Sequence, residues 1–182
     1  APYYTESGWR GALDTEGGGV LINQSVHTLD LLGQFLGRAD RVEAVMANHH
    51  LKNVIQVEDM MEAYLQFGEA SALFYATTAY CADSPVLVEV VCENATLRME
   101  EQEVTLTWKD GTKEHFQLAA PKSPATGKAY WGASHGLCIA DFYHCVRENQ
   151  PFRNDIPGIR DTAELMLAMY ESAREHKVVE LA

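Results

Sequence analysis

Segment 17–36 combines three consecutive glycines with polar side chains spaced along an otherwise apolar run. At about 100° per residue, Asn23, His27, Asp30 and Gln34 fall within a sector of roughly 60° on one side of a helix. Amide, imidazole and carboxylate groups in such a stripe can bind a polar ligand, or they can satisfy one another in a buried network. An unpaired polar group in a protein interior costs about 1–3 kcal/mol. We therefore expect the stripe to face a wet pocket or other polar groups.

The helix that carries this stripe is predicted to be largely buried, because the rest of segment 20–36 is apolar in nearly every direction. It should end at Gly37. Two interpretations remain open: His27 bonds Asp30 or a backbone carbonyl within the core, or the stripe is a pocket wall. The glycines at 17–19 do not form the GxGxxG pattern of a dinucleotide site. We expect them to allow close approach of the backbone to a ligand or a partner domain, with a flexible lead-in loop as the alternative.

Three other groups of reactive side chains lack the geometry of a catalytic or metal site. His135 and Asp141 lie roughly 120° apart on a predicted helix, so they do not converge on one ion, and no metal is expected. The pair at 49–50 consists of two histidines in a predicted strand, where adjacent rings point to opposite faces. Ser25 lies roughly 160° around the helix from His27, which excludes a hydrolase triad.

The composition limits the partners that this chain can bind. Its 182 residues include 26 acidic and 14 basic side chains, with a formal net charge of −12. Nucleic acids and anionic membranes attract clustered Lys and Arg, so neither is expected as a partner. No apolar run is long enough to span a bilayer, and the N-terminal residues lack the pattern of a signal peptide, so we expect a cytoplasmic protein. The four cysteines show no CxxC spacing and are predicted to be reduced core residues.

Six or seven strands are predicted after Gly37 from alternation and from β-branched and aromatic content. The segments with these features are 41–51, 60–67, 70–80, 85–93, 95–100, 103–109 and 113–118. The Asp-Gly pair at 110–111 is typical of an antiparallel hairpin. Two helices, over 135–149 and 156–177, and a short strand over 178–181 complete the chain.

This order of elements predicts an α+β fold with a single domain over residues 1–182. Its core is one large, open, mostly antiparallel sheet with helices packed on one face. No helix remains to cover the other face, although the strands are apolar on both sides, as with Met61 and Leu65 against Met60 and Tyr64. We expect self-association through the sheet, as a homo-dimer or a higher oligomer, to cover this face.

Five stretches of the sequence resemble, in the same order, segments of one enzyme family. They are WRG, GGGVLINQSVHTLDLL, VEDMMEAYLQF, YWGASHGLCIADF and GIRDTAELMLAMYESAREHKVVEL. The chain resembles the C-terminal domain of the glucose–fructose oxidoreductase, inositol dehydrogenase and MocA family over its full length. The resemblance implies a fold like the C-terminal domain of glyceraldehyde-3-phosphate dehydrogenase.

The resemblance also implies a partner, an N-terminal Rossmann domain that binds NAD or NADP and contributes a catalytic lysine. This chain has neither a nucleotide fingerprint nor the Glu-Lys-Pro motif of the family. No residue here is therefore expected to bind the cofactor, and the chain alone is expected to be inactive.

Individual residues take expected roles from the same resemblance. His27 matches the family histidine that assists proton transfer to or from a sugar hydroxyl. Asn23 stands where the family has an aspartate, and since an amide cannot shuttle a proton, its expected role is to orient substrate by hydrogen bonds. Trp9 and Arg10 are candidates for binding substrate hydroxyls or a carboxylate. His135 resembles a family histidine near the cleft or the interface.

The implied function is that of the substrate domain of an NAD(P)-dependent oxidoreductase that acts on a sugar, a polyol or a related small hydroxy compound. Two alternatives remain open. The chain is a non-catalytic dimerisation or scaffold module that lacks its Rossmann partner, or it belongs to a relative that uses NAD for glycoside cleavage. The polar stripe favours the first function, because a scaffold has no need of it.

Overall fold

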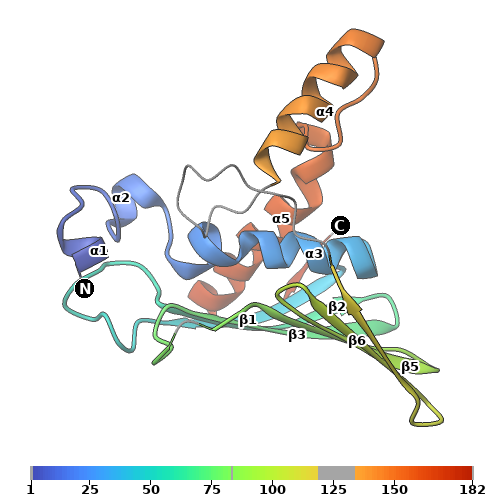
Figure 1. The fold of residues 1–182 in the computed structure, drawn as a ribbon. Coiled ribbons are helices and arrows are strands. Elements are labelled where there is room, and N and C mark those ends of the chain that lie inside the picture. Colours follow the sequence, from blue (N-terminus) through green and yellow to red (C-terminus); the bar gives the residue numbers. More distant parts are fainter. Residues whose placement is uncertain (1, 83, 119–133, 182) are drawn as a thin grey trace. The chain divides into compact units, whose positions relative to one another are not determined.

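The computed structural model describes residues 2–82, 84–118 and 134–181, and Figure 1 shows its fold. The chain forms two compact units. Unit 1 comprises residues 1–82 and 154–182, and unit 2 comprises residues 83–153. Each unit has its own four-stranded antiparallel sheet.

The sheet of unit 1 has the strand order β3, β2, β1, β8. Its strands are β1 (Arg41–Ala47), β2 (Met60–Phe67), β3 (Ala70–Thr77) and β8 (Val179–Glu180). In the observed register, Ala44 lies opposite Ala63, which in turn lies opposite Phe74. All three side chains are buried, and the residues that alternate with them face away, as the two-residue period of a strand requires. One face of this sheet therefore belongs to the core.

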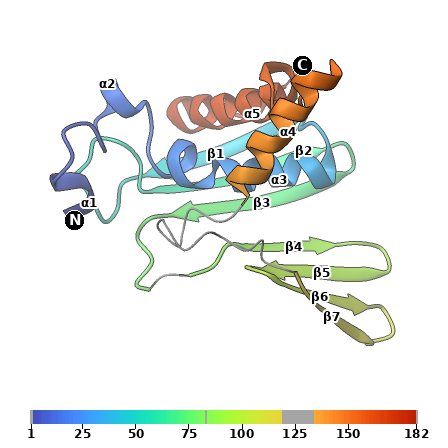
Figure 2. The ribbon, with the colours of Figure 1, turned by 45° about the horizontal axis from the view of Figure 1, so that its top comes forward.

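Helices cover that face of the sheet (Figures 1 and 2). The covering elements are α5 (Ile156–Glu175) and a continuous segment in which the π-helical turn η1 (Leu21–Ser25) leads into α3 (Val26–Leu36). The core between helices and sheet includes the fully buried residues Leu21, Leu29, Val42, Met61, Leu65 and Met169. Two short helices, α1 (Pro2–Thr5) and α2 (Leu13–Glu16), precede η1. α3 ends at Gly37, as predicted.

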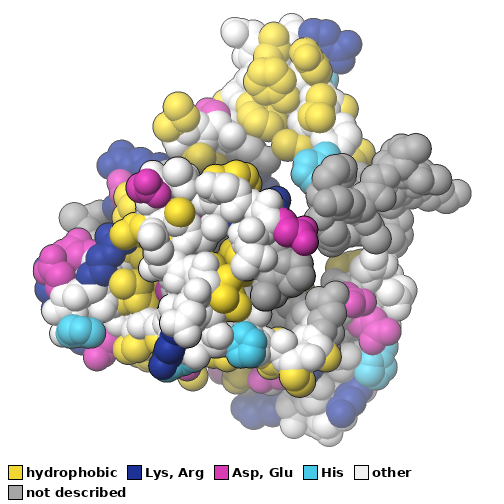
Figure 3. Space-filling model, turned by 90° about the vertical axis from the view of Figure 1, so that its left-hand side faces the viewer, with side chains coloured by type: hydrophobic (Ala, Val, Ile, Leu, Met, Phe, Trp, Pro, Cys, Tyr) yellow, Lys and Arg dark blue, Asp and Glu magenta, His cyan; other side chains and the backbone are white. Residues whose placement is uncertain are grey.

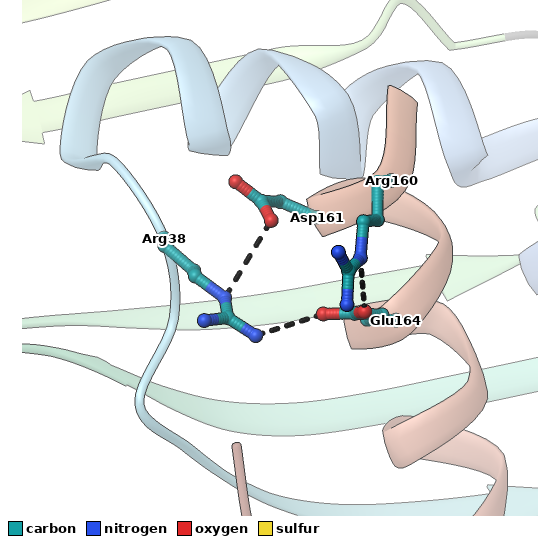
Figure 4. A network of polar contacts seen from close by, with 4 residues as sticks. All are labelled: Arg38, Arg160, Asp161 and Glu164. Carbon is teal, nitrogen blue, oxygen red and sulfur yellow. Dashed lines mark hydrogen bonds and ion pairs between the residues drawn. The ribbon is translucent and has the colours of Figure 1, made fainter. Parts of the chain in front are cut away.

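An ion-pair network joins the end of α3 to α5 (Figure 4). Arg38 Nη2 lies 2.8 Å from Glu164 Oε2, and Arg38 Nε lies 3.5 Å from Asp161 Oδ1. Arg160 Nε lies 2.7 Å from the other carboxylate oxygen of Glu164. Hydrogen bonds from Arg160 and Arg38 lower the pKa of Glu164. These contacts join the turn after α3 to α5, but they are solvent-accessible and contribute little to stability.

In its described residues, 84–118 and 134–153, unit 2 has a four-stranded meander and one helix. Its strands follow each other in order, β4 (Leu87–Val91), β5 (Ala95–Glu100), β6 (Glu103–Trp108) and β7 (Lys113–Gln117), and its helix is α4 (His135–Glu148). The predicted hairpin turn is confirmed, since Gly111 adopts φ +88° and Trp108 N donates to Thr112 O at 2.9 Å. Hydrophobic side chains gather on α4 in the upper part of Figure 3. The exposed ones are Leu137, Ile139, Phe142, Tyr143 and Val146.

The α+β class and the antiparallel pairing are confirmed, with differences in detail. The strands pair in two groups of four instead of one large sheet, because alternation predicts strands but not which strands pair. The histidines at 49–50 lie beyond the end of β1, in an exposed turn and not in a strand. No helix within the described ranges is both long and apolar enough to cross a membrane.

The cysteines depart in part from the prediction. None of the four forms a disulfide with another described residue, but only Cys145 is buried, while Cys81, Cys92 and Cys138 are exposed. The spacing of cysteines in a sequence tests for a disulfide framework or a metal site, and it carries no information on burial. Their expected place in the core was therefore wrong for three of the four.

Gly18 and Gly19 bring the backbone into contact with buried residues of other segments. A Cβ at Gly19 would lie 1.9 Å from the backbone oxygen of Glu58, and one at Gly18 would lie 2.1 Å from the hydroxyl oxygen of Tyr170. Gly17 adopts φ +80° and ends α2. Gly18 and Gly19 therefore make a close approach to Tyr170 and Glu58 of this chain.

Asp59, the residue before β2, anchors the turn that follows β1. Its buried carboxylate accepts hydrogen bonds from the N–H groups of His49, His50 and Leu51 at 2.9, 2.7 and 2.9 Å. Burial on its own raises the pKa of this carboxyl group, but the three N–H donors outweigh burial and hold the pKa below its ordinary value of 3.8. The fold therefore favours the ionised form of Asp59.

Asp59→Asn should remove a pH-dependent contribution to stability, which the ionised carboxylate of Asp59 makes. At neutral pH we expect the free energy of unfolding to fall by about 1–3 kcal/mol, because the amide nitrogen faces N–H donors and leaves at least one unpaired. A carboxyl group whose pKa is lowered in the folded state stabilises the fold at pH values above its ordinary pKa. This contribution is lost as the pH falls through the folded-state pKa. Denaturant titrations at about pH 7 and about pH 3 should therefore give a smaller difference between wild type and variant in acid. An unchanged difference would contradict the assignment.

Gly19→Ala should destabilise the fold by about 3 kcal/mol, the upper end of the usual cost of overpacking, because the added methyl group meets the backbone of Glu58. Gly33, within α3, provides the matched control, since no atom lies within 4 Å of an added Cβ there. Gly33→Ala should stabilise the chain by about 0.5–1 kcal/mol. Thermal unfolding of both variants measures the contrast, and equal effects would rule out the steric explanation.

Candidate functional site

One buried acidic residue, Glu58, bonds the start of the helix that carries the polar stripe. Glu58 Oε2 accepts a hydrogen bond from Gly19 N at 2.8 Å, and Oε1 accepts from Leu21 N at 3.1 Å. The backbone oxygen of Glu58 accepts from Val20 N at 3.1 Å. The first N–H groups of a helix have no partner within the helix and carry partial positive charge, so a carboxylate suits them. Glu58 therefore caps this helix from a distant part of the chain.

Tyr170 of α5 completes the contacts of this carboxylate, since its hydroxyl donates to Glu58 Oε1 at 2.8 Å. Burial, followed by the charge and hydrogen bond of Glu58, raises the pKa of Tyr170 well above its ordinary value of 10.0. The N–H groups of Ile22 and Gly19 oppose this shift but do not cancel it. The phenol therefore remains a hydrogen-bond donor throughout the physiological pH range, and it ties α5 to the first turn of the helix.

The first turn of this helix is π-helical, over Leu21–Ser25. The hydroxyl of Ser25 donates to the carbonyl oxygens of Val20 at 3.0 Å and Leu21 at 3.3 Å. Asn23 lies within this turn, and its N–H donates to Gly19 O at 3.1 Å. A π-helical turn contains more residues than an α-helical one, so the spacing of 100° per residue does not hold before Val26. The turn redirects Asn23 relative to the rest of the stripe.

Two members of the polar stripe, Asn23 and His27, have exposed side chains. Within residues 2–82, 84–118 and 134–181, neither side chain has a hydrogen-bond partner. Gln34 is also exposed, whereas Asp30 is partly buried and accepts a hydrogen bond from Thr162 of α5 at 2.7 Å. Asp30 thus links α3 to α5, whereas His27 takes part in no buried network among the residues that the structure describes.

The helix is buried on one face only, which corrects the expectation that it lies largely within the core. Leu21 and Leu29 are fully buried against the sheet and α5, whereas Phe35 is 44% exposed. The sequence places apolar residues on most faces of this helix, but the sheet and α5 of unit 1 cover only one face. The remaining face carries Asn23 and His27.

Trp9 and Arg10 come together at a cavity of about 520 Å³ in unit 1. The guanidinium carbon of Arg10 lies 4.2 Å from the centroid of the Tyr3 ring and 5.1 Å from that of the Trp9 ring. Arg10 Nε is buried and has no hydrogen-bond partner among the described residues, while Nη1 donates to Tyr3 O at 3.5 Å. The other lining residues are Glu6, Ser7 and Gly8. A cation between aromatic rings beside a cavity is suited to binding hydroxyl or carboxylate groups.

The last predicted site residue, His135, belongs to unit 2, where it is the first residue of α4 and is exposed. The part of the chain that the structure describes holds no group of three or more His, Cys, Asp or Glu side chains that could bind a metal ion. Sequence reasoning missed Glu58, Tyr170 and Ser25. The adjacent glycines are the one signal in the sequence that a tight contact forms here, but they do not name the partner.

The comparisons with known proteins agree on the fold. A family model described as the oxidoreductase family, C-terminal alpha/beta domain, matches residues 1–181. No curated protein matches the chain. An oxidoreductase from Agrobacterium radiobacter, solved with NAD+, L-tartaric acid and magnesium, has 17% sequence identity and a TM-score of 0.82, over 97% of this chain and 52% of that one.

Two further solved structures are similar. The WlbA dehydrogenase from Bordetella pertussis, in complex with NADH and UDP-GlcNAcA, has 22% identity and a TM-score of 0.68, over 99% of this chain and 50% of that one. A levoglucosan dehydrogenase, in complex with NADH and levoglucosan, has 19% identity and a TM-score of 0.79, over 95% of this chain and 53% of that one.

The chain spans about half the length of these solved structures. At such low identity the likeness shows the fold alone, whereas the family model covers almost every residue. The chain therefore belongs to the oxidoreductase family of the glucose–fructose oxidoreductase, inositol dehydrogenase and MocA type, and it has the C-terminal α/β domain of that family.

Proposed function

We propose that this chain forms the substrate side of the active site of an NAD(P)-dependent oxidoreductase that acts on a sugar, a polyol or a related hydroxy compound. The observation that carries the proposal is the exposure of Asn23 and His27 on a helix whose first turn is fixed by Glu58. A rigid element that presents polar groups outward is suited to holding reacting groups in one geometry. The solved relatives that bind NADH or NAD+ together with levoglucosan or L-tartaric acid support this substrate class.

The glycine segment and the helix N-terminus after it do not fit the phosphates of a dinucleotide. The helix N-terminus after the glycines, which would be the favourable place for a pyrophosphate, is already filled by the carboxylate of Glu58. Added methyl groups at Gly18 and Gly19 would collide with Tyr170 and Glu58, so the space beside these glycines belongs to the protein itself. We infer that the cofactor is held by an N-terminal Rossmann domain of the intact protein.

His27 is the proton-transfer group in this proposal. Oxidation of an alcohol to a carbonyl removes a hydride from carbon and a proton from the hydroxyl group, and hydride exchange is the chemistry that NAD(P) supplies when it is bound. Imidazole accepts the hydroxyl proton during oxidation and returns it during reduction. Asn23 orients the hydroxyl by hydrogen bonds, because its amide cannot transfer a proton.

Trp9 and Arg10 extend the proposed substrate site, and His135 is proposed as a further contact near the cleft or the interface. The guanidinium of Arg10 can bind a carboxylate or hydroxyl groups of the substrate, and the Trp9 ring offers an apolar face for a sugar ring. The hollow beside them is open to solvent, so a small polar ligand could reach both side chains.

His27→Ala in the full-length protein should lower turnover by about 10²–10⁴-fold and leave cofactor affinity nearly unchanged, because it removes only the proton step. Asn23→Ala should weaken substrate binding with a smaller loss of turnover, and Asn23→Asp should be tolerated. Turnover with levoglucosan, L-tartrate and common polyols, measured alongside the melting temperature, provides the test. A destabilised but fully active His27→Ala protein would remove His27 from the mechanism.

We also propose that the chain forms a homo-dimer or a higher oligomer through the outer face of the unit 1 sheet. That face carries Val45, Tyr64, Leu73 and Tyr75, and Leu73 is 86% exposed. Tyr64 lies opposite Leu73 in the β2–β3 register, so their side chains adjoin on one face. Adjacent exposed apolar groups on a sheet are typical of an interface between proteins.

Sedimentation equilibrium should therefore find an assembly at least as large as a dimer. Leu73→Lys should shift the protein toward monomer, because a charge in an apolar interface has to lose its water. Leu167→Lys is the matched control, since Leu167 is an exposed leucine of α5, which covers the opposite face of the sheet. A wild-type chain that stays monomeric over a wide concentration range would refute the oligomer.

A further inference from the structure

We propose that Glu58 is a positioning residue for Asn23 and His27: from the loop that leads into β2, it fixes the π-helical turn in the orientation that presents both side chains to substrate. The inference rests on the proposed function for its consequence in catalysis. Its structural basis is independent of that function, because it concerns contacts within unit 1.

Among the described residues, the hydrogen bonds of the Glu58 carboxylate run to the segment that carries Asn23 and to α5. Oε2 is bonded to Gly19 N, and Oε1 is bonded to Leu21 N and to the Tyr170 hydroxyl. None of the ion pairs among the described residues includes Glu58. The buried charge is therefore compensated by hydrogen-bond donors and by the helix N-terminus, so its stabilisation depends on their exact placement.

The turn that contains Asn23 is fixed at both ends. At its start, Gly19, Val20 and Leu21 donate their N–H groups to Glu58. At its end, the hydroxyl of Ser25 bonds the carbonyl oxygens of the same first residues. A π-helical turn is rare and is frequent at functional sites, because it changes the direction of a side chain without ending the helix. The bonds to Glu58 thus set where Asn23 points and where α3, with His27, begins.

Glu58 is itself held rigidly by its neighbour in the sequence. The carboxylate of Asp59 accepts three backbone N–H groups, Asp59 N donates to Ala47 O at 3.0 Å, and Thr78 N donates to Asp59 O at 2.9 Å. These bonds tie Glu58 to the ends of β1 and β3. A fixed link therefore runs from the sheet through Glu58 to the polar stripe.

Glu58 does not touch substrate in this scheme. It is only 6% exposed, and both of its oxygens are occupied by donors of this chain. A carboxylate in such a place cannot exchange a proton with a ligand without giving up these bonds. Its effect on a reaction can reach the substrate only through Asn23 and His27.

Glu58→Gln is the main test, because it keeps the volume but places an NH2 group against at least one N–H or O–H donor. In the 182-residue chain, amide hydrogen exchange at Asn23 to His27 should become about tenfold faster, the effect of losing one buried hydrogen bond. Thr162→Val is the matched control: it breaks another bond between α3 and α5, at Asp30, and should leave exchange at Asn23 unchanged. Uniform acceleration over the chain in both variants would overturn the proposal.

Tyr170→Phe keeps the test decisive if Glu58→Gln does not fold, because it removes a single donor from Oε1. It should accelerate exchange at Asn23 to His27 more than at the β2 amides, and equal acceleration would overturn the proposal.

In the full-length protein, Glu58→Gln or Tyr170→Phe should lower kcat about 10- to 100-fold per folded molecule, as misplacement of reacting groups does, and leave KM for NAD(P) unchanged. If His27→Ala abolishes turnover but these variants retain it, positioning fails and the proposed function stands. If His27→Ala is fully active, the proposed function fails. The hydrogen-exchange measurements then decide alone whether Glu58 fixes the π-helical turn.

Discussion

A buried carboxylate, Glu58, which forms no ion pair with any described residue, constrains how unit 1 is built. Removing the charge of Glu58 from water is costly, and the cost is offset only where donors converge on both oxygens. The donors come from the chain before η1, from η1 itself and from α5. Glu58 and α5 are far in sequence from each other and from η1, so the carboxylate can be satisfied only when helices and sheet are in their final arrangement. Its contacts therefore link secondary structure to tertiary packing.

The same constraint explains the composition of the chain around Glu58. Backbone N–H groups can reach a buried carboxylate only where no side chain holds the backbone away, and Gly18 and Gly19 satisfy this requirement. The hydroxyl of Tyr170 reaches Glu58 over the space that a Cβ at Gly18 would fill. Gly18, Gly19, Glu58 and Tyr170 thus pack together as one cluster. The contacts of each residue depend on the types of the others.

Much of unit 1 could be predicted from local sequence. The end of α3 at Gly37 follows from periodicity and from glycine at a helix terminus, and β2 follows from the alternation of MMEAYLQF. The glycines predicted a close approach, but not Glu58, which lies 39 residues away from Gly19 with no pattern that connects them. The π-helical turn was missed because every angle was taken from ideal α-helical spacing. Strand pairing in two groups also depends on contacts that no single segment encodes.

The candidate site was only partly predictable, for a related physical reason. His27 and Asn23 stand out in the sequence because polar residues interrupt an apolar run, yet the run alone suggested a buried helix. In the structure, apolar side chains hold the helix to the sheet on one face, while the polar pair remains accessible on another. A site needs both properties, since a mobile helix would not align reacting groups and a buried one would not admit substrate.

The charge at the N-terminus of the η1–α3 helix limits which ligands can bind there. A free helix N-terminus attracts anions such as a pyrophosphate, but here the carboxylate of Glu58 already occupies this place. An added anion would meet a charge of its own sign, in a chain whose formal net charge is −12. The segment is thus suited to a neutral hydroxyl compound beside Asn23 and His27. In the proposed substrate site, Arg10, which lies beside the rings of Tyr3 and Trp9, is the cation that a carboxylate of the substrate would meet.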